Sequence, residues 1–437
     1  MGKAPASARG TWCTIVLAAW LALCSREAAA QESDTTLRGE LKRFLYDEAT
    51  ATLHSRSYYF DRQNQSPPNN IALVTGGWVG LQTGWFYDSF QLGAVGYTSQ
   101  PVWAPQNRQD TSDGTSLLLP GGYGFFVLGQ AYASARWQGQ TFTAYRQIID
   151  ELEVNLRDDR ELPYTFEAYA LRGRLGQVNY FAGYVAAVKI REASMFINMA
   201  EAAGAPNVNA GMGLVSAKYG SMDKLQLRTS TYYVPDILWS SYSDAGGTIA
   251  IGSGVKLQLA GQFAVQGSNG LNLLTGHPFG TFWAGVRAEA EWGPIGLYGA
   301  YTQVGSAAQW RSPYGIWIGY NKLQVLDFDR AGERAWQIGA SYDFGMAGLP
   351  GLAFFASATY GGNAVDATSG RLLPENWEYN LDLRFSADKL PLPEWLQPLQ
   401  VRARVAYVDS WLNNSVSSLT EYRVVLNYEV SWKGPRR

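Results

Sequence analysis

The sequence predicts an all-β protein, a transmembrane antiparallel β-barrel, and three observations lead to this prediction. An N-terminal export signal comes first, no later run of about 18 apolar residues could form a spanning helix, and apolar and polar residues then alternate. The composition agrees, because 14% aromatic and 16% charged residues with 47 Gly favour strands and turns over a disordered chain. A formal net charge of −2 argues against nucleic acid as a partner, since nucleic-acid binders carry a basic excess.

Residues 1–30 have the features of a cleaved signal peptide. Two basic residues precede an apolar stretch over 11–24, and the alanines at 28–30 form a small-residue cleavage site. The stretch is too short for a helix that spans a bilayer. A retained N-terminal anchor is the alternative. A lipoprotein signal ending at Cys24 is disfavoured because Leu23 is bulky where a small residue is needed.

The mature chain contains no cysteine, because Cys13 and Cys24 both lie in the signal. Disulfides, thiolate metal sites and cysteine nucleophiles are therefore excluded. Removing 30 of 437 residues takes away three basic side chains and one acidic one, which changes the net charge from −2 to −4. We divide the rest into an N-terminal lead (31–50), a barrel (51–432) and a C-terminal tail (433–437).

Alternation with a period of two residues indicates strands of about 9–11 residues. In the last such segment every second residue from Tyr422 to Trp432 is apolar, and aromatic residues stand at both ends of that row. Aromatic residues in these positions are typical of the interface girdles of a membrane barrel. A soluble β-sandwich would also alternate, but it has no reason to place aromatics at both ends. The alternating segments are 257–265, 282–292, 336–344, 377–385, 399–407 and 422–432.

The connections between the segments are of two kinds. Tight ones carry glycine and proline, and long polar or glycine-rich ones separate other segments. Short turns at one rim and long loops at the other are typical of outer-membrane barrels. The long connections are 100–122, 147–165, 192–213 and 306–334.

Four arginines on the polar faces of the last strands must face the lumen. An arginine at the lipid midplane of a barrel costs roughly 2–4 kcal/mol, so four of them would cost about 8–16 kcal/mol, as much as the stability of a whole domain. Because the last three segments follow one another in sequence, we expect their arginines to form one cluster. These residues are Arg384, Arg402, Arg404 and Arg423.

The chain resembles the OprD family of outer-membrane porins, the substrate-specific carboxylate channels of Gram-negative bacteria. The likeness runs from about Tyr58 to Trp432, and four stretches in the right order carry it. They are RSYYFDR (56–62); YRQ, DDR and PYTFE (145–147, 158–160, 163–167); DFDRAGERAW with SYDF and GLPGL (327–336, 341–344, 348–352); and WL, LQVRARV and YRVVLNY (395–396, 399–405, 422–428).

The resemblance implies a barrel of eighteen strands in the cell outer membrane, with an inward-folded third loop. It implies an eyelet between that loop and a later one, and a basic ladder that guides carboxylates. We therefore predict passive, selective uptake of small solutes with a carboxylate, such as aromatic acids, other organic acids or amino acids. The implied partners are outer-membrane lipid, lipopolysaccharide and the barrel-assembly machinery, and the chain would be a monomer or a weak homotrimer.

Two rival functions remain open. A general diffusion porin would pass solutes by size alone, and a structural or adhesive barrel would have a blocked lumen. The chain also departs from the family in two places. It continues for five residues after Trp432 instead of ending on an aromatic, and Asp159 stands where the family often has serine.

The predicted site residues fall into two groups, each with a plainer interpretation. The ladder residues could instead pair with acids such as Glu378, Asp382 or Glu429 to line the wall. The acidic and basic eyelet residues could form a loop salt bridge, and the two tyrosines could be packing residues. The ladder comprises Arg56, Arg384, Arg402, Arg404 and Arg423, and the eyelet comprises Tyr145, Asp158, Asp159, Arg160 and Tyr164.

We expect no catalytic residues, no metal and no cofactor. His54 and His277 are the two histidines, and neither lies in a catalytic motif. A hydrolase triad and a His/Cys metal site both need ligands or bases that this sequence lacks. The sequence therefore predicts a channel and not an enzyme.

Overall fold

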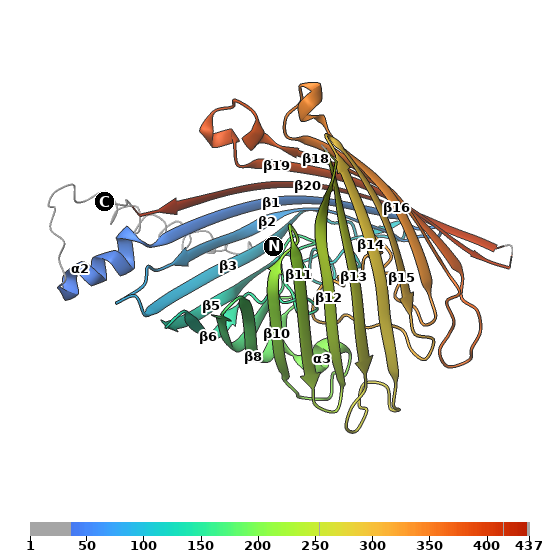
Figure 1. Cartoon of the computed structure of the whole chain (residues 1–437), viewed down its shortest axis with the longest axis horizontal. Helices are drawn as coiled ribbons and strands as arrows, with labels where there is room; N and C mark the ends of the chain where they lie inside the picture. The colour runs from blue at the N-terminus through green and yellow to red at the C-terminus, as the bar shows by residue number, and fades with distance from the viewer. Residues whose placement is uncertain (1–35, 253, 414, 435–437) are drawn as a thin grey trace, which may run out of the picture.

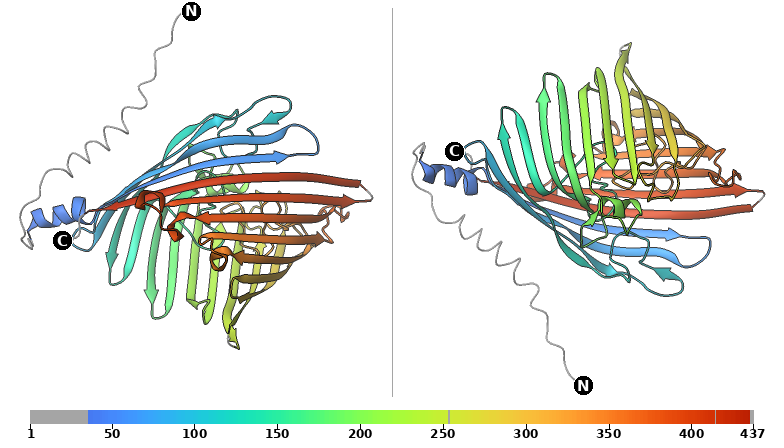
Figure 2. Two further views of the ribbon diagram at one scale, coloured as in Figure 1. Left: turned by 90° about the horizontal axis from the view of Figure 1, so that it is seen from above. Right: turned by 90° about the horizontal axis from the view of Figure 1, so that it is seen from below.

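A computed structural model describes residues 36–252, 254–413 and 415–434. The predicted signal peptide lies outside the described residues. Within them, one antiparallel sheet closes on itself, because the first long strand pairs with the last as well as with the second. In Figures 1 and 2 the blue β1 and the red β20 lie side by side. The predicted β-barrel is confirmed.

Eighteen long strands form the wall of the described barrel, as the resemblance implied, and two strands of two residues are added at loops. The strands extend from Thr50 to Lys433, one residue beyond each predicted end. The long strands are β1 (Thr50–Gln63), β2 (Asn69–Gln82), β3 (Phe90–Trp103), β5 (Phe125–Trp137), β6 (Gln140–Gln147), β7 (Thr165–Leu175), β8 (Val178–Lys189), β10 (Met212–Ser221), β11 (Leu225–Val234), β12 (Leu238–Ile251), β13 (Val255–Gly267), β14 (Gly280–Trp292), β15 (Ile295–Val304), β16 (Arg334–Asp343), β17 (Leu352–Gly362), β18 (Glu375–Ser386), β19 (Leu399–Leu412) and β20 (Ser415–Lys433).

The remaining elements are short. None of the helices in the described ranges is long and apolar enough to cross a membrane. These elements are α2 (Leu37–Lys42), the π-helical η1 (Arg43–Asp47), β4 (Asp110–Thr111), β9 (Ile197–Asn198), α3 (Met199–Ala203), and the 3₁₀ turns η2 (Phe344–Ala347), η3 (Ala387–Lys389) and η4 (Glu394–Leu396).

The alternation seen in the sequence separates an outer face from an inner one. In β18 the apolar residues are exposed while Glu378, Asn380 and Asp382 between them are buried. The same holds in β20, where Tyr422 and Val424 are exposed and Arg423 is buried. Large apolar side chains thus face lipid, and the charged residues face the lumen, as their cost in lipid requires.

The long connections lie at one rim, as predicted, since 104–124, 148–164, 190–211 and 305–333 all follow strands that run in the direction of β1. The separation of long loops at one rim from short turns at the other is less strict than expected. At that same rim β11 and β12 are joined by only three residues, and at the opposite rim the connection 387–398 carries η3 and η4.

Candidate functional site

The third loop at the rim that carries the long connections, residues 148–164 (hereafter L3), crosses the lumen. At one end of its span, Glu151 and Glu153 accept hydrogen bonds from Ser216 of β10 (2.6 Å) and Ser240 of β12 (2.8 Å). At the other, Asp158 accepts from Arg56 of β1 at 2.5 Å. Because these strands lie on different parts of the wall, L3 bridges the barrel and narrows it.

A second loop, residues 305–333 (hereafter L7), meets L3. The Asn155 side chain donates to the carbonyl of Ile316 (2.9 Å) and accepts from its N–H (2.8 Å), and the Asn155 N–H donates to Tyr314. Farther along L7, the Glu378 carboxylate of β18 accepts from three consecutive backbone N–H groups, at 3.0, 3.0 and 2.7 Å. L3 and L7 together form a constriction, as the resemblance implied.

Three of the predicted ladder arginines gather around one carboxylate beside this constriction. Asp382 accepts from Arg384 at 2.9 Å and from Arg402 at 2.5 Å, and its carboxylate lies 3.8 Å from the Nε of Arg404. The strand register explains the cluster, because Arg384 is paired with Arg402 and Asp382 with Arg404 across β18 and β19.

This cluster, called the arginine triad below, carries a positive excess and is open to the lumen. It sets three guanidinium groups against one carboxylate. The exposed side-chain fractions are 59% for Arg384, 38% for Arg402 and 21% for Arg404. The Nε of Arg404 is buried and has no hydrogen-bond partner among the described residues. The triad therefore keeps donors and charge that its own acid does not satisfy.

The other two predicted ladder residues hold the loops. Arg423 is buried, and it donates to Glu421 (2.6 Å) and to the carbonyl of Gln324 in L7 (2.7 Å). Arg56 is also buried, and it donates to Asn427 of β20 and to L3. Their donors are occupied, so the plainer interpretation, pairing with protein groups, describes these two arginines.

The charged residues predicted for the eyelet are likewise paired. Asp159 accepts from Arg191 at 2.6 Å and lies 3.5 Å from Arg160 and 4.0 Å from Arg157. Burial alone would raise the pKa of Asp159, but the surrounding guanidinium groups lower it below the ordinary range. Asp158 is held by Arg56. These contacts hold L3 in place and are those of the loop salt bridge, one of the two interpretations given for these residues; direct contact with a solute stays a prediction.

The two predicted eyelet tyrosines are not together. Tyr164, at the end of L3, is buried in a hydrophobic cluster with Val154 and Phe166 and offers no free ring face, because its apolar ring is covered by the packing. Tyr145 lies on β6, outside L3, and is about half exposed. The surroundings of Tyr164 are those of a packing residue, the plainer of the two interpretations given for it.

Sequence reasoning missed the residues that position the two loops. Asn155 and Gln324 lie in loops whose paths no periodicity describes, and Arg191 lies in the loop after β8. From the sequence, Glu378 is predicted only as a possible partner for an arginine. Its place on the inward face of β18 was a usable signal, because a buried acid needs several donors.

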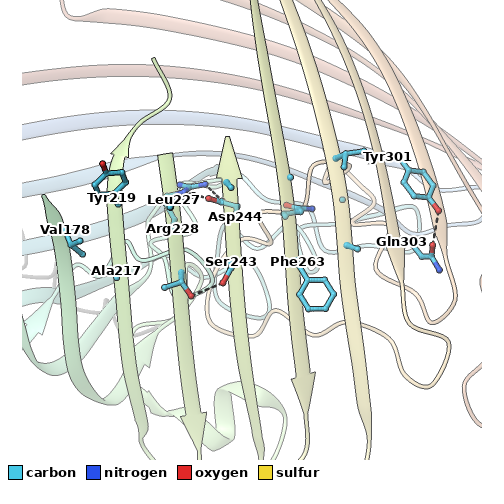
Figure 3. Close-up of a pocket in the computed structure, with 17 residues that line it drawn as sticks. Val178, Ala217, Tyr219, Leu227, Arg228, Ser243, Asp244, Phe263, Tyr301 and Gln303 are labelled. Carbon is cyan, nitrogen blue, oxygen red and sulfur yellow. Dashed lines mark hydrogen bonds and ion pairs between the residues drawn. The ribbon is translucent and has the colours of Figure 1, made fainter. Parts of the chain in front are cut away.

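Another hollow lies elsewhere, on the outer wall across β10 to β15 (Figure 3). Its volume is about 820 Å³, and its lining includes small side chains such as Ala217, Ser243 and Ala284 as well as the larger Phe263 and Tyr301. The Thr229 and Ser243 hydroxyls pair with each other at 2.9 Å. Because this hollow faces lipid, it is not part of the passage.

No group of three or more His, Cys, Asp or Glu residues within the described ranges is arranged to hold a metal ion. A transmembrane barrel whose lumen is narrowed by two inward loops and lined by charged groups defines a class of protein, the outer-membrane porins.

Comparisons with known proteins agree with this class. The family model for outer membrane porins of the OprD family matches residues 143–432. No curated protein matches the sequence.

Solved structures share the fold. OccK9 (OpdG) of Pseudomonas aeruginosa is 20% identical with a TM-score of 0.78, and the match covers 89% of this chain and 100% of that one. OpdK of the same organism, crystallised with vanillate, is 21% identical with a TM-score of 0.76 and the same coverage. A BenF-like porin from Pseudomonas fluorescens Pf-5 is 17% identical with a TM-score of 0.77, again over 89% and 100% of the two chains.

The chain belongs to the OprD family of outer-membrane porins. The predicted family and the predicted outer-membrane location are thereby confirmed, and the family is one of channels, as the sequence predicted.

Proposed function

We propose that this porin is a selective channel for small solutes that bear a carboxylate, and that the arginine triad guides them through the constriction. The observation that carries the proposal is the unequal ratio at Asp382, where three guanidinium groups open to the lumen share one carboxylate. An anion that enters the lumen meets charge and donors that the protein has left available.

The chemistry of the triad suits passage better than tight binding. A guanidinium group stays charged and matches a carboxylate with two parallel hydrogen bonds. In a wet pore with a high effective dielectric constant, each pairing contributes on the order of 1 kcal/mol. Several shallow sites in a row let a solute enter and then leave.

The net charge of the whole chain does not create this preference, because it is slightly negative. The selectivity must be local, set by the triad beside the constriction. Arg56 and Arg423 contribute indirectly, since they hold L3 and L7 in place. One solved relative was crystallised with vanillate, an aromatic carboxylate, which supports this solute class.

The experiment compares the wild type with the double variant Arg402→Ala/Arg404→Ala in planar bilayers under a salt gradient. The wild type should show a reversal potential that favours anions, and the double variant should lose most of this preference. Arg371→Ala is the matched control, because Arg371 lies in the connection between β17 and β18, away from the triad.

Equal flux of gluconate and of glucose, a neutral sugar of similar size, through the wild type would contradict the proposal. It would favour a general diffusion porin, in which size alone sets the flux. Absence of single-channel conductance in the purified protein would instead favour a blocked, structural barrel.

We further propose that the chain is inserted by the barrel-assembly machinery, contacts lipopolysaccharide, and is a monomer or a weak homotrimer. Trp432 supports the first point, since it lies near the end of β20 and is paired with Ala51 of β1 where the barrel closes. Crosslinking in intact outer membranes would test the oligomeric state, and a strong dimer or tetramer band would contradict it.

A further inference from the structure

A pocket opens below L3, on the side toward the rim where β1 begins. It has a volume of about 350 Å³ and lies between L3 and the inward faces of β1, β2, β3 and β5. Its walls are mostly aromatic or apolar, and its polar groups are amides, hydroxyls and the carboxylate of Asp158. The lining used in the argument is Trp78, Gln82, Tyr97, Gln130 and Tyr132, with Leu156 of L3 above them.

Two glycines create the space by letting tyrosine rings lie flat against the wall. A Cβ at Gly93 would come within 2.3 Å of the Tyr132 ring, and a Cβ at Gly129 within 2.3 Å of the Tyr97 ring. Such distances are far inside van der Waals contact. Neither glycine has a positive φ, so the need for glycine here is steric. The shape of the pocket therefore depends on the absence of a side chain at these two glycines.

The tyrosine hydroxyls are oriented by amides. Gln82 donates to the Tyr132 hydroxyl at 3.0 Å, and Gln130 donates to the Tyr97 hydroxyl at 2.5 Å. Each hydroxyl accepts in these bonds and so keeps its own proton to donate. Tyr132 is only partly buried, which leaves its hydroxyl within reach of a molecule in the pocket.

The charges at the edge of the pocket are already balanced. Asp158 lies at its upper rim and is held by Arg56. His54 is stacked on Trp78, with ring centroids 3.7 Å apart, and is bonded to Glu429. A charged group placed here would lose water and find no unpaired counter-charge, so the pocket favours a neutral group.

We propose that this pocket is a second binding site on the solute path, and that it binds a neutral aromatic ring bearing a hydroxyl or carbonyl substituent. A cavity of roughly 150 Å³ holds benzene in a protein interior, so the volume here is ample for a substituted ring. The aromatic walls provide ring contacts, and Tyr132 donates to the substituent oxygen. For a solute that also carries a carboxylate, this inference rests on the proposed function. The triad would bind the carboxylate, and the pocket would bind the aromatic ring.

The test uses neutral probes, so that its failure and a failure of carboxylate selectivity can be told apart. Single-channel blockades are recorded with 4-hydroxybenzamide, benzamide and acetamide. The wild type should hold 4-hydroxybenzamide at least about 5-fold longer than acetamide. Gly93→Ala should abolish this difference, because the new methyl group pushes the Tyr132 ring into the pocket.

Gly213→Ala is the matched control, since Gly213 is a strand glycine whose added Cβ would meet no atom within 4 Å. It should keep the wild-type ratio of residence times. Tyr132→Phe provides a second test that does not depend on the folding of Gly93→Ala. It should shorten blockades by 4-hydroxybenzamide and by benzamide relative to those by acetamide, because both rings carry an oxygen that can accept from the Tyr132 hydroxyl.

Two results would overturn the pocket assignment. One is equal residence of 4-hydroxybenzamide and acetamide in the wild type. The other is a residence ratio that Gly93→Ala and Tyr132→Phe both leave unchanged. Neither result would affect the proposed function, which is tested by a reversal potential that favours anions and depends on the triad. Conversely, a long residence of the neutral ring in a channel without anion selectivity would contradict only the proposed function.

Discussion

Glu378→Gln should release L7 from the wall and widen the passage. The Glu378 side chain is fully buried and accepts four hydrogen bonds: three from consecutive backbone N–H groups of L7 and one from the Asn380 side chain at 2.9 Å. Glutamine has one acceptor oxygen, and its NH₂ group would face at least one of these donors.

The magnitude follows from this count. Hydrogen bonds to a charged group contribute about 1.5–3 kcal/mol each, so the loss of one or two of them weakens the anchor by roughly 3 kcal/mol. Since 1.4 kcal/mol is a factor of ten, the ratio of detached to anchored L7 should rise on the order of 100-fold. Detachment removes one side of the constriction.

Single-channel recording provides the assay. Glu378→Gln should show larger or noisier conductance steps than the wild type, while circular dichroism should show that the barrel is retained. Glu375→Gln is the control, because Glu375 lies on the same strand but is exposed. Conductance and noise identical to those of the wild type would refute the claim that Glu378 positions L7.

Three further predictions follow from the same contacts. Asp382→Asn should increase anion selectivity, because it removes the one carboxylate of the triad, and a reversal potential that shifts toward cations would contradict this. Asn155→Ala should separate L3 from L7 and raise conductance for large solutes, as liposome swelling can measure. Burial raises the pKa of Glu153 and of Glu161 to about 8, so both carboxyl groups are protonated in the folded protein at neutral pH and ionised in the unfolded one. The folded state then binds more protons, stability should fall as the pH rises from about 4.5 to about 8, and Glu153→Gln/Glu161→Gln should flatten this dependence in thermal melts.

The fold was largely predictable because the membrane restricts what a strand can expose. Every second residue of 422–432 must be apolar for the strand to face lipid, so the sequence alone reveals the orientation of Arg423. Strands that follow one another in sequence are neighbours in the wall, which is why the clustering of Arg384, Arg402 and Arg404 could be expected.

Which arginines hold loops and which stay accessible in the lumen could not be predicted in the same way. Arg404 and Arg423 are direct partners across β19 and β20, and both point inward. Only the path of L7 decides that Arg423 is buried and donates to Gln324, while the Arg404 side chain keeps 21% of its surface exposed. Loop paths depend on single contacts such as those of Asn155 and not on a repeating pattern, so they cannot be predicted from periodicity.

The central claim is that the arginine triad binds the carboxylates of passing solutes, and a crystal soaked with 4-bromobenzoate tests it most directly. Anomalous scattering from bromine locates the molecule without reference to the protein density. We predict a carboxylate within about 2.7–3.1 Å of guanidinium nitrogens of Arg402 or Arg404. A bromobenzoate bound within the lumen but away from all three arginines of the triad would contradict the account.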